Sequence, residues 1–146
     1  MIQFTIEPFV GPLPLRFGMT PEQVEGILGP PDSIRTSYFG TRIEQRPHFG
    51  LGFSKDDATL DEAVFAPGAT VLFKGHDLFA EPDLVSTLRR YDSETYLWVG
   101  SVVYFHLGIL ISGYHDSDES QKAIAVVCKG YWDEYAAKFI PYDMRT

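Results

Sequence analysis

The side chains that could do chemistry in this sequence are four histidines, one cysteine and a scatter of carboxylates. The histidines, His48, His76, His106 and His115, form no pair at a metal-ligand spacing such as H-x-x-x-H. The acidic segment from His115 to Glu119 offers several oxygens, but it lacks the central glycine and distal glutamate of a calcium loop. We therefore predict no metal and no cofactor, and we interpret residues 115–121 as a solvated hairpin tip.

The sequence contains no recognisable catalytic motif. A serine nucleophile would need an elbow such as G-x-S-x-G, which is missing, and the glycines of Phe49–Phe53 open no helix and so predict no dinucleotide site. The carboxylate pairs Asp56/Asp57 and Asp61/Glu62 are expected in turns, where nearby water would leave their pKa values unraised. We therefore predict that the protein is not an enzyme.

Cys128 is the single cysteine, which excludes an intramolecular disulfide and fits a reducing compartment. It follows the apolar run Ala123–Val127, which is typical of a buried strand. We expect an inert core thiol there rather than a nucleophile, because an apolar environment raises the pKa of a thiol.

Composition limits the class of protein and its partners. With 146 residues, 45% of them hydrophobic, the chain fits one domain, and its 13 glycines, 10 prolines and 14% aromatics favour many short strands. A net charge of −8 argues against nucleic acid and anionic lipid as partners, and it fits either a basic protein partner or a need for solubility alone. Since there is no signal peptide and no apolar run of about 20 residues, we predict a cytoplasmic protein.

The clearest local signal is a helix at Pro21–Leu28. Thr20 suits the N-cap, Pro21 the first helical position, and Gln23 completes a capping box. Gly29 and the two prolines after it predict where the helix ends. Its apolar stripe is expected to be Val24, Ile27 and Leu28.

Further elements follow from alternation and helical periodicity. We predict strands at residues 3–6, 33–39, 49–53, 60–65, 70–73, 95–99, 102–105, 107–114 and 123–128, with a polar connection at Gly40–Pro47. Two further helices are expected, one at Glu81–Tyr91 and an amphipathic one at Tyr131–Phe139 that carries Trp132.

The two halves of the sequence match in order and in detail. Phe49–Phe53 corresponds to Phe105–Ile109, and Ala63–Phe65 corresponds to Ala125–Val127. We predict an α+β fold in one domain, 1–146, in which a helix plus an antiparallel β-meander is used twice (about 1–67 and 68–146). The meanders would form one continuous or saddle-like sheet with short helices on one face. The alternative is two similar hairpins that arise from common turn chemistry.

The string F-G-M-T-x-x-Q-V-x-x-I-L-G-x-P, from Phe17 to Pro31, resembles the helix signature of the BamE (SmpA/OmlA) and β-lactamase-inhibitor-like superfamily. The resemblance covers about fifteen residues and implies the fold and a protein-binding style of function. BamE-type proteins are exported lipoproteins and the inhibitor is disulfide-bonded, so neither envelope assembly nor β-lactamase inhibition is implied. Small acidic proteins of this kind are also similar in style to cytoplasmic immunity proteins of bacterial toxin systems.

These observations lead to three functional hypotheses. The first is a non-catalytic protein-binding module, an immunity-type inhibitor whose Asp116, Asp118 and Glu119 steer a basic partner and whose Tyr131 supplies an exposed contact. In the alternative interpretation of the C-terminal aromatics, they only cover the core. The second hypothesis is a small-molecule-binding protein or an enzyme that uses the concave sheet face. The third is a structural partner in a larger assembly or a homodimer, and the sequence leaves the oligomeric state open.

Overall fold

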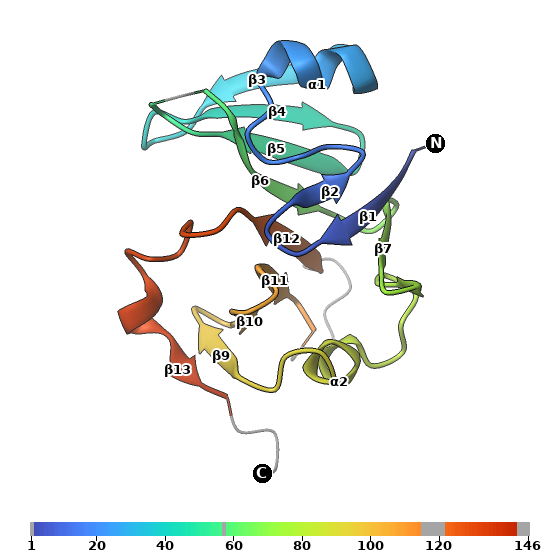
Figure 1. The fold of residues 1–146 in the computed structure, drawn as a ribbon, viewed down its shortest axis with the longest axis vertical. Helices are drawn as coiled ribbons and strands as arrows, with labels where there is room; N and C mark the ends of the chain where they lie inside the picture. Colours follow the sequence, from blue (N-terminus) through green and yellow to red (C-terminus); the bar gives the residue numbers. More distant parts are fainter. Residues whose placement is uncertain (1, 57, 115–121, 143–146) are drawn as a thin grey trace.

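The computed structural model describes residues 2–56, 58–114 and 122–142, which form two β-sheets with short helices at their edges (Figure 1). The described residues contain thirteen strands, two α-helices and one 3-10 helix. The elements in chain order are β1 (Gln3–Glu7), β2 (Gly11–Leu13), α1 (Pro21–Leu28), β3 (Ser33–Thr36), β4 (Arg42–Arg46), β5 (Phe49–Phe53), β6 (Leu60–Phe65), β7 (Thr70–Phe73), β8 (His76–Asp77), α2 (Leu84–Arg89), β9 (Thr95–Trp98), β10 (Ser101–Tyr104), β11 (Ile109–Ser112), β12 (Ala123–Val127), the 3-10 helix Ala136–Lys138 and β13 (Ile140–Pro141).

The larger sheet has nine strands in the order β13-β9-β10-β11-β12-β6-β5-β4-β3, and every neighbouring pair is antiparallel. The smaller sheet has the order β2-β1-β7-β8, with β1 and β7 parallel. The smaller sheet covers the middle of the larger one, near the junction of β6 and β12 (Figure 1). Side chains on the facing sides of the two sheets form the main core.

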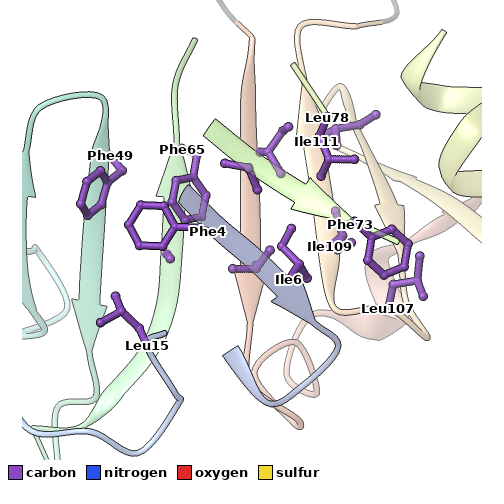
Figure 2. Close-up of a cluster of buried hydrophobic side chains, with 14 of the residues drawn as sticks. Phe4, Ile6, Leu15, Phe49, Phe65, Phe73, Leu78, Leu107, Ile109 and Ile111 are labelled. Carbon is purple, nitrogen blue, oxygen red and sulfur yellow. The ribbon is translucent and has the colours of Figure 1, made fainter. Parts of the chain in front are cut away.

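Aromatic rings lie at the centre of this core. Phe4 of β1 lies between Phe49 of β5 and Phe65 of β6, with its ring centroid 5.0 Å from each of the other two (Figure 2). Ile6 and Phe73 extend the same layer towards β11, where it meets Ile109. The core side of the large sheet is thereby covered, and its opposite side, which we call the outer face, has to be covered by other parts of the chain or left to solvent.

The prediction of an α+β repeat of helix plus β-meander is wrong. The described part of the chain is mostly β, with 13 strands and a helix content of only 13%, and its two α-helices have 8 and 6 residues. The strand match between the halves also fails at Phe105–Ile109, because Phe105 to Gly108 form the turn between β10 and β11. Gly108 has a φ of +66° and packs against Phe9, so its glycine belongs to a tight turn rather than to a strand. The division into two repeats stays a prediction.

Helix α1 confirms the predicted caps and two of the three residues of the predicted apolar stripe. Gln23 N donates to Thr20 Oγ1 at 3.2 Å, and Thr20 N donates to Gln23 Oε1 at 2.9 Å, which completes the capping box. Val24 is fully buried, whereas Ile27 is 43% exposed. Leu28 is half-buried and packs against the core, so the predicted stripe fails only at Ile27.

Helix α2 is shorter than the predicted Glu81–Tyr91. Asp83 is its N-cap and accepts a hydrogen bond from Ser86 N at 3.2 Å, so the helix begins only after this residue. Glu81 lies before the cap, where its carboxylate bonds His76 Nδ1 at 2.6 Å. Leu84 and Leu88 are buried against the core.

The predicted polar connection at Gly40–Pro47 is instead strand β4. Its charged residues Arg42, Glu44 and Arg46 alternate on the core side, and Glu44 and Arg46 are buried. Glu44 accepts hydrogen bonds at 2.9 Å from both arginines, and Arg46 Nη2 donates to Gly29 O at the end of α1. In this strand charged side chains occupy the buried positions, where apolar residues are usually found. The sequence pattern therefore does not predict a strand here.

The predicted helix Tyr131–Phe139 is also wrong, since the segment forms successive turns and the 3-10 helix Ala136–Lys138. Trp132 and Phe139 are nevertheless buried, against aromatic residues of β9 and the turn after β10. Stacking of Tyr135 on Trp98, with ring centroids 5.2 Å apart, fixes the segment to the outer face. Tyr, Trp and Phe are only moderate helix formers, so intrinsic propensity favours a helix weakly in this segment. The aromatic contacts with the outer face therefore determine its conformation.

Candidate functional site

A β-bulge in β6 brings two carboxylates together on the outer face. The register of β5 against β6 shifts so that Gly52 faces Glu62 and Phe53 faces Leu60, which leaves Asp61 as the extra residue. An ideal Cβ placed on Gly52 would lie 3.3 Å from Glu62 Oε1 and 3.7 Å from Asp61 Oδ1. Both carboxylates therefore lie over Gly52, and the lack of a side chain there makes room for them. We call Asp61 and Glu62 the carboxylate pair.

Burial makes this pair electrostatically unusual. It raises the pKa of Asp61 from its ordinary value to about 6, although its own backbone hydrogen bond acts in the opposite direction. It also raises the pKa of Glu62, with a further increase from the charge of Asp61, while a hydrogen bond with Tyr131 lowers it. Among the described residues, neither carboxylate forms an ion pair with a lysine, arginine or histidine. The expectation that water would leave these carboxylates unperturbed is wrong, because they lie in a half-buried strand and not in a turn.

The segment after β12 positions the third polar group of the site. Cys128 N donates to Asp61 O at 3.0 Å, and Tyr131 N donates to Cys128 O at 3.2 Å, so the backbone brings Tyr131 next to β6. Tyr131 is half-buried, and burial together with the charges of Glu62 and Asp61 raises the pKa of its hydroxyl. The sequence predicted an exposed aromatic side chain here, whereas Tyr131 is half-buried and its hydroxyl bonds Glu62.

Two hollows lie on either side of the carboxylate pair. The first hollow contains Asp61 and has a volume of about 470 Å³; we call it the tip hollow, because Phe39 at the tip of the β3–β4 turn lines it. Its lining residues are Phe39, Thr41, Asp61, Cys128, Lys129, Gly130, Tyr131, Glu134 and Tyr135. The second, which we call the sheet hollow, has a volume of about 580 Å³ and contains Glu62; it is lined by Arg35, Ile43, Gln45, His48, Phe49, Gly50, Leu51, Gly52, Glu62, Val64, Phe65, Ala66 and Ala123. The pair is thus reachable from two sides.

Two exposed aromatic rings lie side by side next to the tip hollow, and one of them, Phe39, lines it. Tyr38 and Phe39 are 97% and 72% exposed, and they form the turn between β3 and β4 with their rings in an edge-to-face contact at 5.4 Å. Ser37 Oγ accepts from the backbone N–H groups of Phe39 and Thr41, both at 3.2 Å, so the turn is held by its own hydrogen bonds. Sequence reasoning missed this feature because it extended the strand to Phe39; the Ser37–Gly40 turn signal could have revealed it.

Of the partner-binding residues predicted from sequence, the structure describes only Tyr131. Asp116, Asp118 and Glu119 lie outside the described residues, and the structure does not test their role. Tyr131 contacts a site that sequence reasoning did not assign, since the carboxylate pair had been assigned to a turn. A cue was nonetheless present, because Asp61 and Glu62 also fall within the predicted strand 60–65, which follows the predicted strand 49–53 that contains Gly52.

The thiol of Cys128 lines the tip hollow and is half-buried, just beyond the end of β12. Burial raises its pKa, and the charge of Asp61 raises it further. The thiol therefore stays protonated at neutral pH, which disfavours a role as nucleophile.

Of the histidines that the structure describes, His48 lines the sheet hollow together with Glu62, whereas His76 and His106 pair with other carboxylates. His106 bonds Glu94 at the surface, and this hydrogen bond raises the pKa of His106. His76 bonds Glu81 and, through its other ring nitrogen, Tyr91 at 3.1 Å. Across the ranges 2–56, 58–114 and 122–142, no group of three or more His, Cys, Asp or Glu side chains could hold a metal ion.

No helix in the described part of the chain is long and apolar enough to cross a membrane. Comparison of the chain with protein-family models, with curated proteins and with solved structures gave no match. The resemblance of the helix signature around Thr20 to the BamE and β-lactamase-inhibitor-like superfamily therefore stays a prediction, and the function has to be argued from the site itself.

Proposed function

We propose that this protein is a non-catalytic protein-binding module, an immunity-type inhibitor that covers a basic surface of a bacterial toxin. The observation that carries the proposal is the exposed pair Tyr38 and Phe39, held in a hydrogen-bonded turn beside a hollow that contains Asp61. Aromatic side chains are enriched at the energetic centres of protein interfaces. A rigid turn presents them to a partner at a low cost in conformational entropy.

Charge supports a basic partner. The chain carries a net charge of −8, and the carboxylate of Asp61 lies in the same hollow as the exposed ring of Phe39. Complementary charge raises the association rate and disfavours unsuitable partners. Asp116, Asp118 and Glu119 keep their predicted role in steering the encounter, and in this proposal the inhibitor acts in the cytoplasm. The oligomeric state is left open.

The proposal is tested by affinity capture from the lysate of the native host, followed by binding kinetics on the purified partner. We expect the double variant Tyr38→Ala/Phe39→Ala to dissociate about tenfold faster or more, because interface centres contribute 2 kcal/mol or more. Val99→Ala is the matched control, since Val99 is also exposed and lies in a turn near the other end of the large sheet. Equal dissociation rates for the double variant and the wild type would contradict the proposal.

A second candidate function is a small-molecule-binding protein or an enzyme in the sheet hollow. It is favoured by Glu62, which lines this hollow and whose pKa is raised by burial, since carboxylates with perturbed pKa values are typical of active sites. A small molecule that co-purifies with the protein and is lost in Glu62→Gln would favour this candidate. Retention of that molecule in Glu62→Gln would count against it.

A further inference from the structure

The carboxylate of Asp61 has no cationic partner within the described residues, although it is half-buried. Buried charge is usually paired, because transfer from water is costly. The sequence supplies Lys129 in the lining of the tip hollow, but Lys129 is exposed and forms no ion pair with Asp61. With Asp61 and Glu134 in the same lining, the tip hollow has an excess of negative charge.

Aromatic groups complete the lining of this hollow. Phe39 lies at its rim, and Tyr131 and Tyr135 contribute from the segment after β12. Tyr135 is held in place by its stacking on Trp98, and Tyr131 by its backbone hydrogen bond to Cys128. Carboxylate and aromatic groups together suit one kind of ligand, because a cation gains both from ion pairing and from contact with a ring face.

We propose that the tip hollow receives an arginine side chain of the protein partner, with its guanidinium on Asp61 and beside the rings of Phe39 and Tyr135. This inference rests on the proposed protein-binding function. Arginine suits the hollow better than lysine, because its planar guanidinium bonds a carboxylate through two N–H groups and stacks on aromatic rings. The volume of about 470 Å³ falls within the range of about 300–1,000 Å³ typical of ligand pockets.

The lack of a side chain at Gly52 leaves space for the carboxylate of Glu62 beside Asp61. A side chain at this position would displace the carboxylate of Glu62, which approaches the ideal Cβ position to 3.3 Å. Glu62 in turn accepts from Tyr131, so the carboxylate pair and the hydroxyl form one polar unit at the edge of the hollow. Glu62 thereby adds negative charge next to Asp61 without occupying the space of the ligand.

The test uses N-acetyl-arginine amide as probe and N-acetyl-citrulline amide as its neutral isostere, each titrated against the full chain and followed by NMR. We expect the arginine compound to bind about tenfold tighter or more, since charge-assisted hydrogen bonds contribute that much. The binding should be lost in Asp61→Asn and weakened in Phe39→Ala. Asp56→Asn is the matched control, because Asp56 is exposed in the turn after β5.

Equal binding of the two amides, or arginine-amide binding that survives Asp61→Asn, would overturn the inference. A thermal melt shows whether Asp61→Asn is folded; if it is not, Phe39→Ala replaces it, because Phe39 is exposed at the edge of the hollow, and unchanged binding in this variant would overturn the inference. The two proposals fail in different ways. If the probe does not bind but partner capture still depends on Tyr38 and Phe39, only the arginine pocket is wrong. If the probe binds but no protein partner depends on these rings, the protein-binding proposal fails.

Discussion

The two ends of the outer face differ although they belong to one sheet. At the end formed by β9 and β10, the segment after β12 covers the face, and Trp132 and Phe139 are buried there. At the end formed by β4, β5 and β6, the face is open and presents Gly52 and the half-buried Glu62. The covered end has the composition of a core, and the open end retains polar groups that a core would exclude.

This difference indicates that the open end contributes less to the free energy of unfolding than the covered end. A half-buried carboxylate without a cation destabilises a fold, whereas an aromatic ring packed on a sheet stabilises it. Functional sites commonly retain such unfavourable groups. We therefore expect substitutions at the covered end to affect folding and those at the open end to affect binding.

The largest expected effect is at the covered end. Trp132→Ala should lower the free energy of unfolding by about 3–5 kcal/mol, because it removes a buried ring from the aromatic cluster over β9 and β10. Denaturant melts measure this directly. Tyr38→Ala, at the exposed turn, is the control and should change stability by less than about 0.5 kcal/mol. Similar losses for both variants would mean that the open end is as much a part of the core as the covered end.

A smaller effect is expected under α1. Val24→Ala should cost about 2 kcal/mol, since Val24 is fully buried and loses two methyl groups. Ile27→Ala should cost less than about 1 kcal/mol, because Ile27 is 43% exposed. The reverse order in denaturant melts would show that the helix packs through its other face.

The cap of the same helix should contribute less than Val24. Thr20→Ala removes the acceptor of Gln23 N and should lower stability by about 1 kcal/mol. Thr20→Ser, which keeps the hydroxyl, is the matched control for the hydrogen bond. If the serine variant loses as much stability as the alanine variant, the capping hydrogen bond is not the cause.

At the open end, Asp61→Asn should stabilise the protein at neutral pH. Because the pKa of Asp61 is raised from 3.8 to about 6 in the folded state, the unfolded chain ionises first as pH rises, and stability falls between these values. At pH 7 the variant should therefore gain about 1 kcal/mol, since water screens a half-exposed carboxylate and reduces the full effect. Below pH 4 the two proteins should be about equally stable. Melts over this pH range measure the difference, and a gain independent of pH would contradict the assignment.

Local signals were the most predictable part of this fold. The capping box at Thr20 and the bounds of β5, β6 and β7 follow from residue types within a few positions. β4 could not be found in this way, because Glu44 and Arg46 are buried where apolar residues are expected, and contacts with each other, with Arg42 and with Gly29 accommodate them. Pattern reading assumes that buried positions are apolar, and this strand violates that assumption.

The candidate site was less predictable for the same reason. The environment of Asp61 depends on a one-residue register shift between β5 and β6 and on the distant segment that carries Tyr131. Neither is visible in local composition. The predicted helix at Tyr131–Phe139 failed because stacking on Trp98 outweighs intrinsic helix propensity.

The central claim is that the open end of the outer face binds a protein partner. Hydrogen–deuterium exchange on the complex with the captured partner tests it most directly, since amides at an interface exchange more slowly. We expect slower exchange at residues 37–43 and at Asp61 and Glu62, with no change at the turn that carries Val99. Slower exchange confined to the β9–β10 turn, with residues 37–43 unchanged, would contradict it.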